Sequence, residues 1–164
     1  KSKVMKLIFT LMFTFFSFFQ SDLESLRNSY SKANSSNENA KNFIALAEKK
    51  SSNDPVISGY KSASKILEAK VTTEKNKRKS FVKSGATTLE SIISSNPNNA
   101  ELRVIRMSVQ ENLPKIVGYN KNLKEDKTFL INNYSKQNAD LKSYIKQFAG
   151  QSKTMTASEK ASFK

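Results

Sequence analysis

From Ser21 to the C-terminus, apolar residues recur at the three- and four-residue spacing of an amphipathic helix. The strict alternation that marks a half-buried strand does not occur, and the chain has only 4 glycines and 3 prolines. The pattern predicts an all-α protein of about six to seven amphipathic helices, arranged in antiparallel hairpins with short polar turns. The expected helices cover about residues 21–33, 40–50, 55–67, 74–95, 100–112, 123–134 and 141–148.

A few polar, proline and glycine residues indicate where the helices start and stop. Asp54-Pro55 combines an acidic N-cap with a proline at the first helical position, where its missing N–H does no harm. Asn96-Pro97 closes one helix before the next begins. Gly85 lies inside a predicted helix and lowers its stability by about 1 kcal/mol relative to alanine. We expect a neighbouring helix to approach closely at this glycine.

Residues 1–20 follow a different pattern. Lys1, Lys3 and Lys6 carry the charges of this segment, and the run 7–19 is almost entirely apolar. A charged region followed by an apolar one is typical of a signal peptide. As a helix, the run would reach about 20 Å at about 1.5 Å per residue, short of the roughly 30 Å hydrocarbon core of a bilayer. The segment therefore predicts export to the periplasm, the cell surface or the medium.

The end of this segment lacks the small-x-small triplet of a cleavage site. Each candidate triplet between Ser17 and Ser21 puts a bulky residue where a small one is needed. Cleavage near residue 20 is the main expectation, and two alternatives stay open. One is an uncleaved signal anchor that tethers the protein to a membrane, and the other is a buried apolar helix of the folded domain.

The rest of the chain is long enough for one domain with a sizeable core and short for two. We expect one helical domain over residues 21–150, ending at Gly150. Residues 151–164 offer only Met155 and Phe163 for burial, and termini with few anchors tend to fray. The sequence therefore predicts a frayed or disordered C-terminal tail.

The chain contains neither cysteine nor histidine. This removes disulfides, thiolate nucleophiles, imidazole bases and the usual zinc ligand sets, so we expect no cofactor and no metal. Carboxylates, serines and lysines could still form a two-carboxylate or Ser-Lys hydrolase. Neither arrangement has a recognisable motif here, and the adjacent acidic pair Glu125-Asp126 is typical of an exposed helix start. We therefore expect a protein without enzymatic activity.

The formal charge of the chain is +14, and lysine supplies most of it. Nucleic-acid readers depend on arginine for bidentate contacts to phosphate and guanine, and arginine occurs here only at Arg27, Arg78, Arg103 and Arg106. We expect no nucleic-acid partner and interpret the lysines as a solvated surface. The densest basic run, residues 75–79, could contact anionic lipid, although a solvated turn at a helix start is the simpler explanation.

One stretch resembles the second helix of a tetratricopeptide repeat. Gly85, Leu89, Ile92 and Pro97 follow the spacing of that repeat's small, aromatic, small and proline positions. Leu89 replaces the usual aromatic residue, and Ile92 replaces the usual alanine. The resemblance implies a tetratricopeptide-like helical array.

Four blocks of the chain are similar to a family of small exported flavobacterial proteins of the Bacteroidetes. These blocks are residues 55–63, 96–106, 113–119 and 124–127. The resemblance covers roughly residues 40–134. It implies a helical protein of a Gram-negative periplasm or outer membrane, and it implies no particular reaction.

Two arginines are the first candidates for contact with a partner. Arg103 and Arg106 lie three residues apart on the predicted helix 100–112, where they could clamp a carboxylate or phosphate in a groove. The alternative is a set of internal ion pairs with Glu101, Glu90 or Asp126 that orient neighbouring helices.

Two tyrosines and a lysine complete the candidate site. Tyr60-Lys61 and Tyr119 could line the same concave surface as the arginines, and each tyrosine follows a glycine. The alternative is that both tyrosines pack between helices with their hydroxyl groups near the surface.

These features suggest an interaction protein. The main hypothesis is an exported, non-enzymatic, helical-repeat-like protein whose concave face binds a protein or peptide partner. The alternative is a cationic envelope-surface protein that associates with anionic lipid or polymer through its lysines. Salt would separate the two, because it screens surface charge and affects packed apolar contacts much less.

Overall fold

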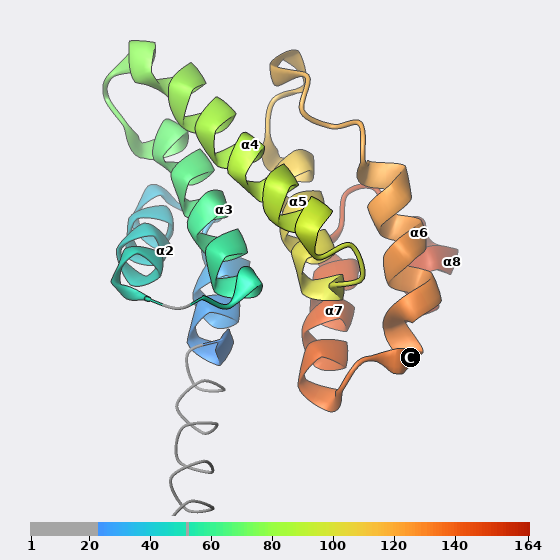
Figure 1. Ribbon diagram of the computed structural model, residues 1–164. Coiled ribbons are helices and arrows are strands. Elements are labelled where there is room, and N and C mark those ends of the chain that lie inside the picture. The colour runs from blue at the N-terminus through green and yellow to red at the C-terminus, as the bar shows by residue number, and fades with distance from the viewer. Residues whose placement is uncertain (1–22, 52) are drawn as a thin grey trace, which may run out of the picture.

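The computed structural model describes residues 23–51 and 53–164, which form helices joined by turns (Figure 1). No strand occurs in this part of the chain, so the predicted all-α class is confirmed. Residues 23–32 are helical, and the elements that follow are α2 (Asn37–Lys49), α3 (Pro55–Val71), the 3₁₀ turn η1 (Lys75–Lys77), α4 (Arg78–Ser95), α5 (Ala100–Asn112), the 3₁₀ turn η2 (Lys115–Val117), α6 (Leu123–Asn133), the 3₁₀ turn η3 (Tyr134–Lys136), α7 (Ala139–Gln151) and α8 (Ala157–Lys160).

The predicted signal segment, residues 1–20, lies outside the described residues. Within residues 23–51 and 53–164, none of the helices combines the length and the apolar character needed to cross a bilayer.

Side-chain caps mark the starts of α2, α3, α5, α7 and the short α8, where Thr156 is the cap. Ser36, Asp54, Asn99 and Asn138 accept hydrogen bonds from backbone N–H groups in the first turns of α2, α3, α5 and α7. At α3, Asp54 Oδ1 accepts from the N–H of residue 56 at 2.6 Å, and Pro55 occupies the first helical position. Each cap satisfies an N–H that has no partner within its helix. The predicted and observed helix starts therefore agree to within a few residues.

Helix α3 packs against both α2 and α4, and its contact with α4 depends on a glycine. A Cβ atom at Gly85 would lie 2.6 Å from Ile66 Cγ1 and 2.6 Å from the backbone oxygen of Ser62. Both distances are well inside van der Waals contact, so any side chain here would push the helices apart. The close approach predicted at Gly85 is confirmed.

Two clusters of buried side chains share α5. The first lies among the helical segment 23–32, α2, α3, α4 and one side of α5, where Leu102 and Ile105 are buried. The second joins α5 to α6, α7 and the C-terminal segment, where Val104 and Met107 are buried. Helix α5 therefore lies between the α2–α4 group and the α6–α7 pair, as Figure 1 shows.

The frayed or disordered tail expected for residues 151–164 is not what the structure shows. Phe163 is 2 % exposed, and its ring meets Tyr134 edge-on with 5.2 Å between ring centroids. Glu111, at the end of α5, accepts a hydrogen bond from the backbone N–H of Thr154 at 3.2 Å. The tail is ordered because its apolar residues complete the second cluster, while a carboxylate from a distant helix holds its backbone.

Candidate functional site

Arg103 and Arg106 lie in an ion network between α5 and α6. Arg106 binds the Asp126 carboxylate through Nε at 2.7 Å and Nη2 at 2.6 Å, and Arg103 Nη1 reaches the same carboxylate at 3.1 Å. Arg106 Nη1 also donates to Glu90 Oε2 at 2.8 Å. Arg103 is 8 % exposed and Arg106 is 3 % exposed. The structure therefore shows the internal pairing, and neither guanidinium is free to clamp a partner.

Burial and pairing shift the pKa values of the two adjacent acids on α6. Burial raises the pKa of Asp126 above its ordinary value, while the hydrogen bonds from Arg106 and Arg103 oppose that rise. The hydrogen bond from Asn122, together with those from the guanidinium groups, lowers the pKa of Glu125. The sequence predicts an exposed helix start at Glu125-Asp126. This prediction is correct for Glu125, which is exposed, and wrong for Asp126, which is buried.

Tyr60 is buried in the first cluster and does not reach the surface. Its hydroxyl donates to Glu101 Oε1 at 2.8 Å, and the same carboxylate accepts from Arg27 Nε at 2.8 Å and Nη2 at 2.6 Å. Burial raises the pKa of Tyr60 well above its ordinary value, so the hydroxyl stays protonated. Lys61, the next residue, is exposed. Tyr60 and Lys61 therefore do not form one binding surface.

Tyr119 differs from the other four predicted residues because it lines a groove. Its hydroxyl donates to Glu90 Oε1 at 2.6 Å. Burial raises the pKa of Tyr119, and the neighbouring Glu90 carboxylate raises it further. Since Glu90 also binds Arg106, it connects one wall of the groove to the ion network.

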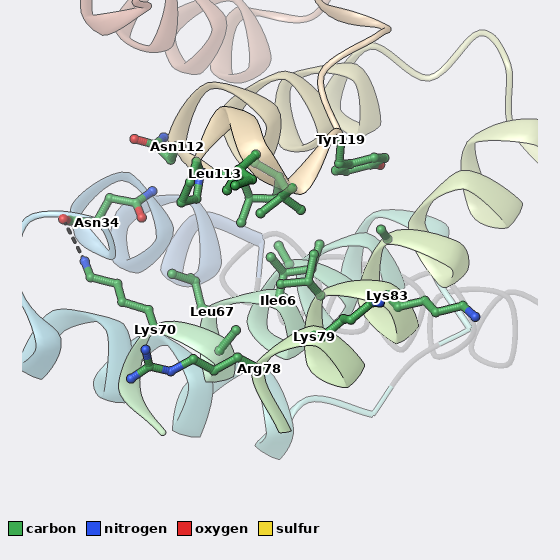
Figure 2. Close-up of a pocket in the computed structure, with 18 of the residues that line it drawn as sticks. Asn34, Ile66, Leu67, Lys70, Arg78, Lys79, Lys83, Asn112, Leu113 and Tyr119 are labelled. Carbon is green, nitrogen blue, oxygen red and sulfur yellow. Dashed lines mark hydrogen bonds between the residues drawn. The ribbon is translucent and has the colours of Figure 1, made fainter. Parts of the chain in front are cut away.

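The groove lies between the α3–α4 pair and the loop that follows α5 (Figure 2). Its volume is about 880 Å³, within the range of about 300–1,000 Å³ typical of ligand sites. Apolar side chains line the groove on both of its sides. On the side of the helix pair they are Ala63, Ile66 and Leu67 of α3 with Val82 and Ala86 of α4, and on the side of the loop they are Leu113, Pro114, Ile116, Val117 and Tyr119.

The loop presents apolar side chains that nothing covers. Ile116 is 96 % exposed and Val117 is 42 % exposed, and these are the exposed large hydrophobic residues in the described part of the chain. Gly118 ends the η2 turn with a φ of 73°, in the left-handed region that favours glycine. Single exposed hydrophobic residues are ordinary on a protein surface. Here both side chains border an apolar groove, so the loop wall of the groove presents uncovered apolar surface to water.

Positive charge follows one side of the groove. Lys70, Arg78, Lys79 and Lys83 all lie on the α3–α4 side, opposite Leu113 and Tyr119 (Figure 2). No acidic residue is among the described residues that line the groove. The groove therefore combines apolar walls with one positive edge.

Of the residues that line the groove, only Tyr119 is predicted from the sequence as a candidate site residue. Arg78 and Lys79 belong to the basic run 75–79, for which a solvated turn is the simpler expectation and contact with anionic lipid the alternative. Ile116 and Val117 are not predicted as site residues. A signal was present, because these two apolar residues stand between Pro114 and a glycine in a segment too short for a buried helix. The sequence does not show what Ile116 and Val117 lie next to, because that depends on the packing of α3 and α4.

Residues 23–51 and 53–164 contain no cluster of three or more acidic side chains arranged to hold a metal ion. A scan against protein-family models finds no match to the chain, and no curated protein or solved structure is significantly similar to it. The apolar groove with its positive edge is the strongest feature from which a function can be proposed.

Proposed function

We propose that this chain is an exported, non-enzymatic, helical-repeat-like interaction protein whose groove binds a segment of a partner protein. The observation that carries the proposal is the apolar groove with an uncovered apolar wall, where Ile116 is 96 % exposed. The packing of α2 on α3, α3 on α4 and α5 on α6 supports a helical-repeat-like arrangement. Export rests on the sequence pattern of residues 1–20.

An open groove suits a peptide better than an acyl chain. Because Ile116 borders the groove and remains exposed, one side of the groove faces water. An amphipathic helix can bury its apolar face in such a groove and keep its polar face in solvent. An acyl chain has no polar face, so its outer side would stay in contact with water. Recognition of a protein segment therefore accounts for both the walls and the opening.

The charge of the molecule supports a second candidate function. The exposed residues Lys75, Lys77, Arg78 and Lys79 lie together at the start of α4. Such a cluster attracts anionic lipid or polymer on an envelope surface. This binding would weaken steeply as salt screens the charges, whereas contact with apolar walls would persist.

Selection from a displayed random-peptide library tests the main proposal. Selected peptides should bind the purified protein, and Ile116→Asn should weaken them about tenfold or more because it removes an apolar contact from the wall. Ile116 is exposed, so this variant should fold normally. Ala45→Asn, at an exposed position of α2 outside the groove, is the matched control and should bind as the unmodified protein does.

Binding is measured by fluorescence anisotropy at low and moderate salt. Peptides that bind Ile116→Asn as well as the unmodified protein would contradict the groove proposal. Peptides that lose all affinity at moderate salt would favour the second candidate.

A further inference from the structure

Two lysines on the edge of the groove have no partner for their side chains within the described part of the fold. Lys79 and Lys83 lie four residues apart on α4, both line the groove, and both are exposed. Neither has an ion pair or hydrogen-bond partner for its side chain among the described residues. Some lysines outside the groove, namely Lys65, Lys77 and Lys127, each pair with a glutamate, whereas others such as Lys142 and Lys146 have no ion pair in the part of the chain that the structure describes. The edge therefore carries positive charge that the folded chain does not neutralise.

The start of α4 concentrates this charge in an unfavourable place. Arg78 and Lys79 are its first two residues, its first turn has no acidic residue, and its N-cap, Lys77, makes no side-chain capping bond. Cations near a helix N-terminus oppose the helix dipole, and like charges four residues apart on a helix repel each other. A carboxylate placed in the groove beside Lys79 and Lys83 would relieve both effects.

We infer that the partner segment is an acidic amphipathic helix. This inference rests on the proposed function and specifies the partner's chemistry. The apolar face of the helix would lie on Ile66 and Leu67 and against Ile116, since these side chains line the two sides of the groove. Its carboxylates would lie on one flank only, because no charged residue of the loop is among those that line the groove. Two acidic residues four positions apart match the spacing of Lys79 and Lys83.

Three synthetic helical peptides test the inference. All three have leucines at positions i, i+3, i+4 and i+7, and they differ on one flank, which carries Glu, Gln or Lys. Fluorescence anisotropy should give the affinity order Glu, then Gln, then Lys, with about tenfold or more between the first and the last. Raising the salt concentration should narrow this difference and leave the affinity of the Gln peptide nearly unchanged.

Paired lysine variants locate the effect on the protein. In Lys79→Gln/Lys83→Gln, the Glu peptide should lose its advantage over the Gln peptide. The matched control is Lys142→Gln/Lys146→Gln, which neutralises two lysines at the same spacing on α7, outside the groove. This control should keep the advantage of the Glu peptide. All four lysines lie at least partly exposed, so both double variants should fold.

The outcomes separate the inference from the proposal on which it rests. Equal affinity for the three peptides, with each weakened by Ile116→Asn, would overturn the acidic partner and leave the groove a protein-binding site. Both would be overturned if no peptide binds and the protein instead binds phosphatidylglycerol vesicles through Lys79 and Lys83.

Discussion

Arg106 is a charged residue whose neighbours make burial tolerable. It is buried in the protein, with two hydrogen bonds to Asp126 and one to Glu90. The net gain from such a network is small, because the desolvation of the charges offsets much of their attraction. Removal of one member is different, since it leaves the others buried without compensation. The network therefore fixes the position of α6 against α5 more than it adds to stability.

The substitution Arg106→Met tests this view. Methionine fills similar space without charge and leaves Asp126 buried with Arg103 as its remaining partner. We expect the free energy of unfolding to fall by about 3–5 kcal/mol, measured by urea denaturation. Arg78→Met is the control, because Arg78 is exposed and its loss should change the unfolding free energy by no more than about 0.5 kcal/mol. Similar values for the two variants would show that the network has no structural role.

Helix α4 packs on α3 at a position where only glycine fits. Gly85→Ala adds a Cβ that would meet Ile66 and the backbone of Ser62 at 2.6 Å. The gain of about 1 kcal/mol in helix propensity should be outweighed by overpacking, with a net loss of about 1–3 kcal/mol in unfolding free energy.

Gly150 is the matched control for this prediction. It lies near the end of α7, and a Cβ there would meet nothing within 4 Å. Gly150→Ala should therefore stabilise the protein by about 0.5–1 kcal/mol, again by urea denaturation. The two substitutions should change the free energy of unfolding in opposite directions. If Gly85→Ala instead raised it, the close approach of α3 and α4 would be contradicted.

The sequence could predict the helices because their signals are local. A cap such as Asp54-Pro55 acts within one turn, so its effect does not depend on the rest of the fold. The loop has a local signal in Ile116 and Val117, but the groove as a whole has none, since α3, α4 and the loop after α5 each supply part of it. The sequence named Glu101, Glu90 and Asp126 as possible internal partners of Arg103 and Arg106. Only the folded structure shows that Asp126 and Glu90 bind these arginines and that Glu101 binds Arg27 instead. Order in the tail likewise depends on contacts with Tyr134 and with Glu111 at the end of α5.

At the scale of the whole molecule, α5 links the two buried clusters. Leu102 and Ile105 belong to the first cluster, while Val104 and Met107 belong to the second. These residues alternate along one helix. If either cluster opened, α5 would lose its packing contacts on that side, and the other cluster would be weakened as well. We therefore expect the described chain to unfold in one cooperative transition, as small single domains usually do.

Phe163→Ala tests this cooperativity from the far end of the chain. The substitution removes a buried ring that packs on Tyr134, and the cavity should lower the unfolding free energy by about 3–5 kcal/mol. Hydrogen exchange measured at the slowest amides of α3 and of α7 should then show the same loss of protection, although α3 lies in the other cluster. Lys164→Ala, at the exposed last residue, should change neither set. A loss confined to α6, α7 and α8 would mean that the second cluster opens alone, and α5 would then be a boundary between two units instead of a shared core.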